Sequence, residues 1–151
     1  MQIELLFGTE TGTAEFLCED LAEALEDEAT CSLSGMETVD PSTLSGEPFY
    51  ILVSSTFGSG DVPGTAQTFY EALQKRPDLG HVRFAIFGLG DRTFDDTFNQ
   101  GSEKIMTEML ACGAKMVGER GLFDASSAEM PEDIAIPWAR EILVQLSAEA
   151  A

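Results

Sequence analysis

Largely apolar runs alternate with segments of helical periodicity along the whole chain. Three runs, at 3–7, 49–53 and 82–87, have the composition of strands buried on both faces of a sheet. Weaker extended segments lie at 30–33 and at 116–123, where Met116-Val117 and Leu122-Phe123 together predict a last strand. Residues 39–46 are predicted to be loop with one turn of helix.

Four segments between these runs predict amphipathic helices. The first covers Thr11–Glu28, and its apolar stripe consists of Ala14, Leu17, Cys18, Leu21 and Leu25. Its other face is acidic, with Glu15, Glu19, Asp20, Glu23, Glu26 and Asp27. The apolar stripe of the second helix consists of Ala66, Phe69, Tyr70 and Leu73. The third helix has Ile105 and Met109 on its apolar side and ends near Gly113. The fourth, from Pro131 to about Ser147, has Ile134, Trp138, Ile142 and Leu146.

Helices that alternate with fully buried strands indicate an α/β fold with a parallel, doubly wound sheet. Five strands in 151 residues fit one domain, residues 1–151, with the strand order 2-1-3-4-5. Ligands of such sheets bind at the carboxyl ends of the strands, at the switch point between strands 1 and 3. The segments after Phe7, Val53 and Phe87 are therefore the expected binding loops.

The strongly negative charge of the chain limits the classes of molecule that it is expected to bind. It has 27 acidic and 8 basic residues, a net charge of −19, and residues 1–74 contain 14 acids and no Lys or Arg. This excess disfavours nucleic acid and anionic membrane surfaces, and favours a basic partner protein or simply solubility. We expect a cytoplasmic protein without a metal site, since its three cysteines match no metal-binding spacing and it has no signal peptide or membrane-length apolar run.

The first loop, Gly8 to Ala14, has the composition of a phosphate cradle. Its hydroxyls and Gly12 lie where a strand ends and a helix begins, so that N–H groups and the helix dipole converge on an anion. An anion in this half of the chain must be held by neutral donors. The alternative is a simple helix cap by Thr9 or Thr11, which needs only one hydroxyl.

The second and third loops each combine glycines with an aromatic residue. The second, Ser54 to Pro63, contains Phe57 before Gly58, and the third begins Gly88-Leu89-Gly90-Asp91 and contains Phe94 and Phe98. Two aromatic rings on adjacent loops can sandwich a flat heteroaromatic ring. The alternative is that both rings pack into the core.

In their order and spacing, the three loops resemble those of the flavodoxin family. The matching segments are Thr9-Glu10-Thr11-Gly12-Thr13-Ala14, Ser55-Thr56-Phe57-Gly58-Ser59-Gly60-Asp61-Val62-Pro63, and Gly88-Leu89-Gly90-Asp91 with Phe94 and Phe98. The tail, with Pro131-Glu132-Asp133 and Pro137-Trp138-Ala139, is similar to that of short-chain flavodoxins of the MioC type. The flavin domains of sulfite reductase and cytochrome P450 reductase share the loops. The resemblance covers the whole chain and implies the flavodoxin-like three-layer sandwich.

The resemblance implies non-covalently bound FMN and one-electron transfer. Phe57 and Phe94 would flank the isoalloxazine, and Gly58 matches the glycine whose peptide turns over to hydrogen-bond N5 after one-electron reduction. Asp124 would approach the flavin edge. The residues expected to bind FMN are Thr9, Glu10, Thr11, Gly12, Thr13 and Ala14 at the phosphate, Ser54, Ser55, Thr56, Phe57, Gly58 and Gly60 in the second loop, and Leu89, Gly90, Asp91, Phe94, Phe98 and Asn99 in the third.

The chain departs from the family pattern at three positions. Position 94 is commonly tyrosine and position 57 commonly Trp, Tyr, His or Thr, and both are Phe here; position 99 is often Cys and is Asn here. Residues 114–130 leave no room for the insertion of long-chain flavodoxins. Acids near the expected flavin rim, Asp61, Asp91, Asp95 and Asp96, would disfavour the anionic reduced flavin and steer the site toward basic partners.

Other functions of the same fold fit less well. A receiver domain needs an acidic pocket where this chain has Gly8-Thr9 and Ser54-Ser55, and a hydrolase needs a base where the chain offers only His81, at the far end of a strand. The resemblance implies an electron carrier that needs a separate flavin reductase and an acceptor enzyme. Two alternatives stay open: an FMN domain excised from a diflavin reductase, although Met1 and the Ala-rich tail are typical of natural ends, and a non-redox interaction module.

Overall fold

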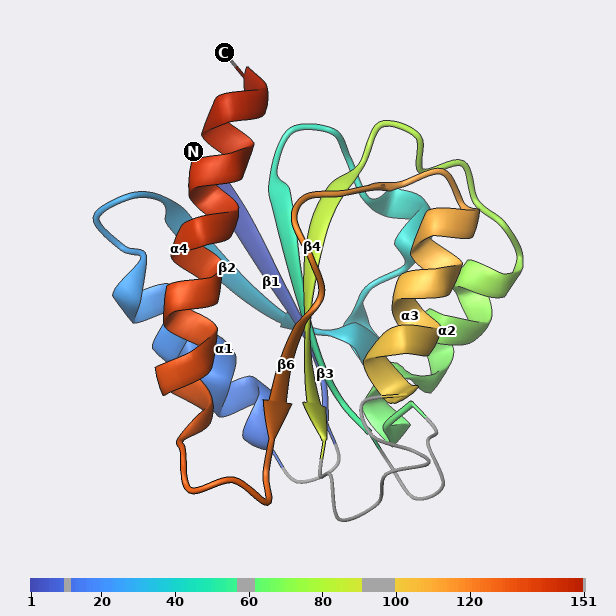
Figure 1. Cartoon of the computed structure of the whole chain (residues 1–151). Helices are drawn as coiled ribbons and strands as arrows, with labels where there is room; N and C mark the ends of the chain where they lie inside the picture. The colour runs from blue at the N-terminus through green and yellow to red at the C-terminus, as the bar shows by residue number, and fades with distance from the viewer. Residues whose placement is uncertain (10–11, 57–61, 91–99, 151) are drawn as a thin grey trace.

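The computed structural model describes residues 1–9, 12–56, 62–90 and 100–150, and in it a parallel sheet is covered by helices on both faces (Figure 1). The strands are β1 (Gln2–Gly8), β2 (Thr30–Gly35), β3 (Phe49–Ser55), β4 (Arg83–Gly90), β5 (Lys115–Met116) and β6 (Gly121–Asp124). Their order, β2-β1-β3-β4-β5, with β6 also paired to β4, confirms the predicted topology.

The α-helices are α1 (Thr13–Ala24), α2 (Gln67–Gln74), α3 (Gln100–Ala111) and α4 (Pro131–Ala150), and short 3-10 helices span Met36–Thr38, Pro41–Thr43 and Gly64–Ala66. Figure 1 shows α1 and α4 on one face of the sheet and α2 and α3 on the other. The stripe predicted for α1 is buried throughout. In α4 the buried side centres on Ala135, Ala139, Ile142 and Leu146, so that Ile134 and Trp138 are only half-buried at its border.

The first helix is shorter than the periodicity predicted. Gly12 is its N-cap residue, with a φ of 92° that L side chains rarely adopt, so the helix begins at Thr13. At its other end, Leu25 takes a non-helical conformation and the following residues form a turn. The predicted helical turn within 39–46 is confirmed by Pro41–Thr43, where the Asp40 carboxylate accepts a hydrogen bond from the Ser42 N–H (3.0 Å).

The last strand, predicted as one, consists of two short strands, β5 and β6, that pair with the same neighbour, β4. β5 pairs with the start of β4, and β6 pairs with its end, from Phe87↔Gly121 to Gly90↔Asp124. Between them Gly118 has a φ of 72° and packs under Ile142 of α4. The Trp138 indole N–H donates to the Glu119 carbonyl (3.0 Å), so the interruption is anchored to α4, while the Val117 N–H still donates to the Phe84 carbonyl of β4 (2.8 Å).

The cysteines are structural in this fold. Cys18 and Cys112 are buried and Cys31 is half-buried, and desolvation raises the pKa of all three thiols. They therefore stay protonated near neutral pH, as expected of small apolar side chains. No helix in the described part of the chain combines the length and apolar composition that crossing a membrane requires.

Candidate functional site at the carboxyl edge of the sheet

The three predicted loops leave the same edge of the sheet. The parallel register pairs Gly8 with Ser54, Ser54 with Gly88, and Ser55 with Leu89, so β1, β3 and β4 end level with one another. In Figure 1 this edge is at the bottom of the molecule. Among the predicted site residues, Thr9, Gly12, Thr13, Ala14, Ser54, Ser55, Thr56, Leu89 and Gly90 are described; Glu10, Thr11, Phe57, Gly58, Gly60, Asp91, Phe94, Phe98 and Asn99 lie outside the described residues, as do Asp61, Asp95 and Asp96.

The first loop turns directly into α1. The Gly12 N–H donates to the Thr9 hydroxyl (2.8 Å), and the Phe16 N–H donates to the Gly12 carbonyl (3.0 Å) as the helix begins. Gly12, and not Thr9, is thus the N-cap residue of α1, and the Thr9 hydroxyl instead closes the turn that precedes the helix. The first N–H groups of a helix have no intrahelical acceptor, and Gly12 has no side chain with which to cap them. This end of α1 is thus suited to an external anion.

A residue that the sequence analysis missed, Thr65, fixes the first loop. Its hydroxyl accepts a hydrogen bond from the Thr9 N–H (2.7 Å) and donates one to the Thr9 carbonyl (3.0 Å). Both main-chain polar groups of Thr9, which is 8% exposed, are satisfied by one side chain from 56 residues away. The only signal in the sequence is a hydroxyl just beyond the second loop.

The start of the second loop is tied to the first loop and to α3. The Ser55 hydroxyl donates to the Gly8 carbonyl (3.2 Å), and the Thr56 hydroxyl accepts from the Gly101 N–H (3.1 Å). Ser54 is fully buried and its hydroxyl donates to the Ser55 carbonyl (2.9 Å). The Ser54 side chain therefore stabilises the loop from within.

Two glycines allow this close packing. A Cβ on Gly8 would lie 2.7 Å from the Ala66 Cβ, and one on Gly101 would lie 2.5 Å from the Ser55 carbonyl oxygen. Both distances are shorter than real Cβ contacts. Gly8 thus allows the end of β1 to pack against the 3-10 helix Gly64–Ala66, and Gly101 allows the start of α3 to pack against the end of β3.

At the start of the third loop, the main chain lies at the edge of the sheet while the Leu89 side chain is buried in the core. The Leu89 side chain belongs to the core under α1 and α4, as does that of Ala14, so at both positions only the main chain is available to a ligand at the edge. The Gly90 carbonyl accepts from the Ala125 N–H (2.7 Å), and Asp124 pairs with Gly90 and so lies at this edge of the sheet; its approach to a flavin stays a prediction. The Asp124 carboxylate accepts from the Ser126 N–H and hydroxyl (2.9 and 2.7 Å).

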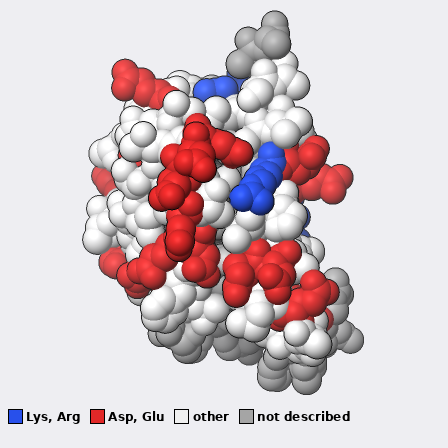
Figure 2. Space-filling view, turned by 90° about the vertical axis from the view of Figure 1, so that its left-hand side faces the viewer, with Lys and Arg blue, Asp and Glu red and all other residues white. Residues whose placement is uncertain are grey.

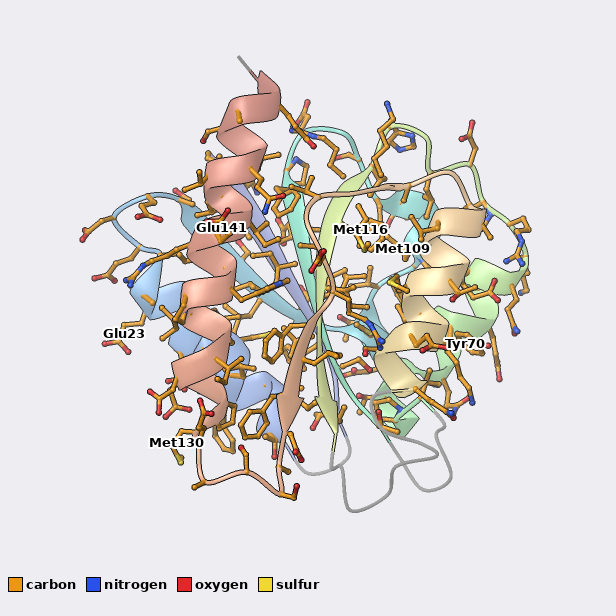
Figure 3. The ribbon with its side chains drawn as sticks, in the orientation of Figure 1. Glu23, Tyr70, Met109, Met116, Met130 and Glu141 are labelled. Carbon is orange, nitrogen blue, oxygen red and sulfur yellow. The ribbon has the colours of Figure 1, made fainter. Side chains whose placement is uncertain are left out.

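Acidic side chains dominate the face of the molecule formed by α1 and α4. Figure 2 shows Asp and Glu spread over this face with few Lys or Arg among them. Glu23 of α1 and Glu141 of α4 are both exposed there (Figure 3). His81, the candidate base of a hydrolase, instead contacts the Leu44 carbonyl through Nε2 (2.8 Å) just before β4 begins, at the opposite end of that strand from the loops.

The donor set fits a phosphate monoester held without cations. The residues assembled from the first 74 offer main-chain N–H groups, hydroxyls and a helix amino terminus, and this segment contains no Lys or Arg. Such a cradle orients an anion by directed hydrogen bonds rather than by ion pairing.

Comparisons with known proteins agree with this geometry. The family model described as Flavodoxin matches residues 5–138. The chain is 40% identical to Protein MioC of Escherichia coli O157:H7 over 139 residues, which cover 90% of this chain and 92% of that protein. It is 34% identical to NADPH-dependent diflavin oxidoreductase 1 of Emericella nidulans over 89% of this chain but 21% of that protein. A solved Pseudomonas aeruginosa flavodoxin superposes with a TM-score of 0.79 at 27% identity, covering 97% of this chain and 99% of that one.

Proposed function

Because the chain belongs to the flavodoxin family and is thus an FMN-binding one-electron carrier, we propose that the loop starts around Thr9, Ser55 and Gly90 form its FMN site. The observation that carries this proposal is the neutral cradle at the switch point between β1 and β3. There Thr65 and Ser55 hydrogen-bond to the main chain of Thr9 and Gly8. FMN, when bound, supplies the one-electron chemistry; the protein residues bind and orient it.

In this proposal the phosphate lies at the amino end of α1. The turn at Gly12 and the hydroxyls of Thr9 and Thr13 surround that position, and Thr65 keeps the Thr9 main chain in place. Phe57 and Phe94 flank the isoalloxazine, and Gly58 provides the peptide next to N5. Ser55, Thr56 and the main chain of Leu89 and Gly90 lie along the same edge and complete the polar lining.

Two related functions use the same site. The similarity to a diflavin oxidoreductase favours, as an alternative, an FMN domain that works within a larger reductase. A non-redox interaction module is supported less, since it would not need the cation-free cradle or the close packing at Gly8 and Gly101.

Visible absorption of the purified protein tests the FMN proposal. We expect a yellow protein whose released cofactor is FMN, and apoprotein that recovers the spectrum when titrated with FMN. Stepwise anaerobic photoreduction is expected to pass through a blue one-electron-reduced form if the Gly58 peptide acts at N5. A red form would retain FMN and remove that role, whereas protein that stays colourless after incubation with FMN would contradict the electron-carrier reading for these residues.

We also propose that the partners are basic proteins that meet the acidic side of the molecule. With a net charge of −19, long-range attraction should raise the rate of encounter by about tenfold or more at low salt. Electron transfer to a small basic haem protein should therefore slow about tenfold between roughly 0.01 and 0.3 M salt, because the Debye length shortens. A neutral quinone acceptor is the control, and its rate should not change.

Matched charge variants locate the steering surface. Glu23→Gln, at an exposed position on α1, should lower the rate and flatten its salt dependence. Glu71→Gln, on the opposite helix layer, should change both less. Equal effects from both positions would show that net charge alone steers the partner, and a rate independent of salt would exclude a basic docking surface.

A further inference from the structure

Arg120 lies in the interruption between β5 and β6, under the first turn of α3. Its guanidinium Nη1 donates to the Ser102 hydroxyl (2.9 Å), and Nη2 lies 3.6 Å from a Glu103 carboxylate oxygen. Its side chain is only 19% exposed, and Ser102 is fully buried. One of the eight basic residues of this acidic chain is therefore largely withdrawn from water.

Withdrawal from water carries a cost for a charged guanidinium. Burial lowers the pKa of Arg120, since the charged form loses hydration, with Glu103 opposing the shift. The amino end of a helix also carries partial positive charge, which repels a cation. An apolar side chain could fill the same space without either cost. The guanidinium does more at this position than fill space, because its two nitrogens reach two residues of α3.

The contacts of α3 supply that reason. The residue before Ser102 is Gly101, whose N–H donates to the Thr56 hydroxyl (3.1 Å) and on which a Cβ would lie 2.5 Å from the Ser55 carbonyl oxygen. The first turn of α3 thus lies between Arg120 on one side and the start of the second loop on the other. It is also the point at which the third loop, residues 91–99, joins the helix.

We propose that Arg120 is a positioning residue of the FMN site, which holds the first turn of α3 against the second loop through Ser102. It rests on the proposed function, since the loops it aligns are those assigned to FMN. The planar guanidinium suits this task because it can reach Ser102 and Glu103 at once in fixed directions. Arg120 does not itself contact the cofactor in this proposal.

A double-mutant cycle on FMN binding tests the inference. Arg120→Met removes the donors and the charge, and the Kd of the apoprotein for FMN is expected to rise about tenfold. Ser102→Ala keeps the charge and removes the acceptor, with a smaller rise expected. If Arg120 acts through Ser102, the double variant is no weaker than Arg120→Met alone. Arg140→Met, an exposed arginine of α4, is the control and should leave the Kd within about twofold.

The midpoint potentials of bound FMN separate positioning from simple support of the fold. A misplaced loop changes the affinities for oxidised and reduced FMN unequally. The midpoint potentials of FMN bound to Arg120→Met and to Ser102→Ala should therefore shift. Arg120→Lys should bind FMN more tightly than Arg120→Met but less tightly than wild type. If Arg120→Met had lower thermal stability but wild-type midpoint potentials, Arg120 would have only a structural role, and the inference would be wrong. So would additive effects, or a wild-type Kd in Ser102→Ala. Failure of the wild-type protein to bind FMN would instead contradict the proposed function.

Discussion

Gly101→Ala is expected to weaken FMN binding by at least about tenfold and to lower the free energy of unfolding by about 2 kcal/mol. In an open helix this change would be favourable by about 1 kcal/mol, because alanine has the higher helix propensity. Here the new Cβ would lie 2.5 Å from the Ser55 carbonyl oxygen and 3.0 Å from the Thr56 Cα. Both neighbours are main chain, so the helix must move away from the second loop, and steric cost exceeds the gain in propensity.

Titration of the apoprotein with FMN and thermal unfolding measure the two effects of Gly101→Ala. Gly80→Ala is the matched control, because a Cβ there would meet nothing closer than 3.4 Å and the residue has no left-handed backbone. Its stability should stay within about 0.5 kcal/mol of wild type. Wild-type affinity in Gly101→Ala would show that α3 can retreat without disturbing the site.

Thr65→Val is expected to have the second largest effect, a loss of about 2 kcal/mol in the free energy of unfolding and roughly tenfold in FMN affinity. Valine keeps the shape of threonine and removes one hydroxyl. That hydroxyl serves both the N–H and the carbonyl of Thr9, at 2.7 and 3.0 Å. Each of these buried groups would lose its partner, and the first loop would lose its fixed position beside the second.

Two variants give the Thr65 experiment its controls. Thr65→Ser retains the hydroxyl and should restore most of the affinity, whereas Thr68→Val repeats the chemical change at an exposed position on α2 and should change little. Equal losses in Thr65→Val and Thr65→Ser would assign the effect to packing of the methyl group. No loss in Thr65→Val would show that water can replace the hydroxyl.

The sheet could be predicted from the sequence because each central strand is a compact apolar run. Phe49–Val53 is buried throughout, and such a run has few alternatives to the middle of a parallel sheet. The same logic placed the three loops at one edge, and the registers of Gly8, Ser54 and Gly88 confirm it. The break in the last strand was not predicted, since it depends on Trp138 and Ile142, which belong to a different element.

The supporting contacts of the site could not be read from the sequence. Thr65 and Arg120 are ordinary residues in sequence terms, and their partners lie 56 and 18 positions away. Periodicity reports which face of an element is buried, and motifs report loops, but neither reports which hydroxyl or guanidinium crosses between elements. The FMN contacts of Phe57, Gly58 and Phe94 stay a prediction from family resemblance.

The split of the last strand also bears on how the molecule behaves at high concentration. A sheet edge offers unpaired N–H and carbonyl groups that a second chain can extend. Here the edge opposite β2 consists of pieces of two and four residues, β5 and β6, separated by the turn at Gly118. A strand of a second chain could form only a few hydrogen bonds with strands this short. The two chains would also repel one another, because each has a net charge of −19. At this edge, the short strands and the shared negative charge both disfavour pairing with a second copy of the chain.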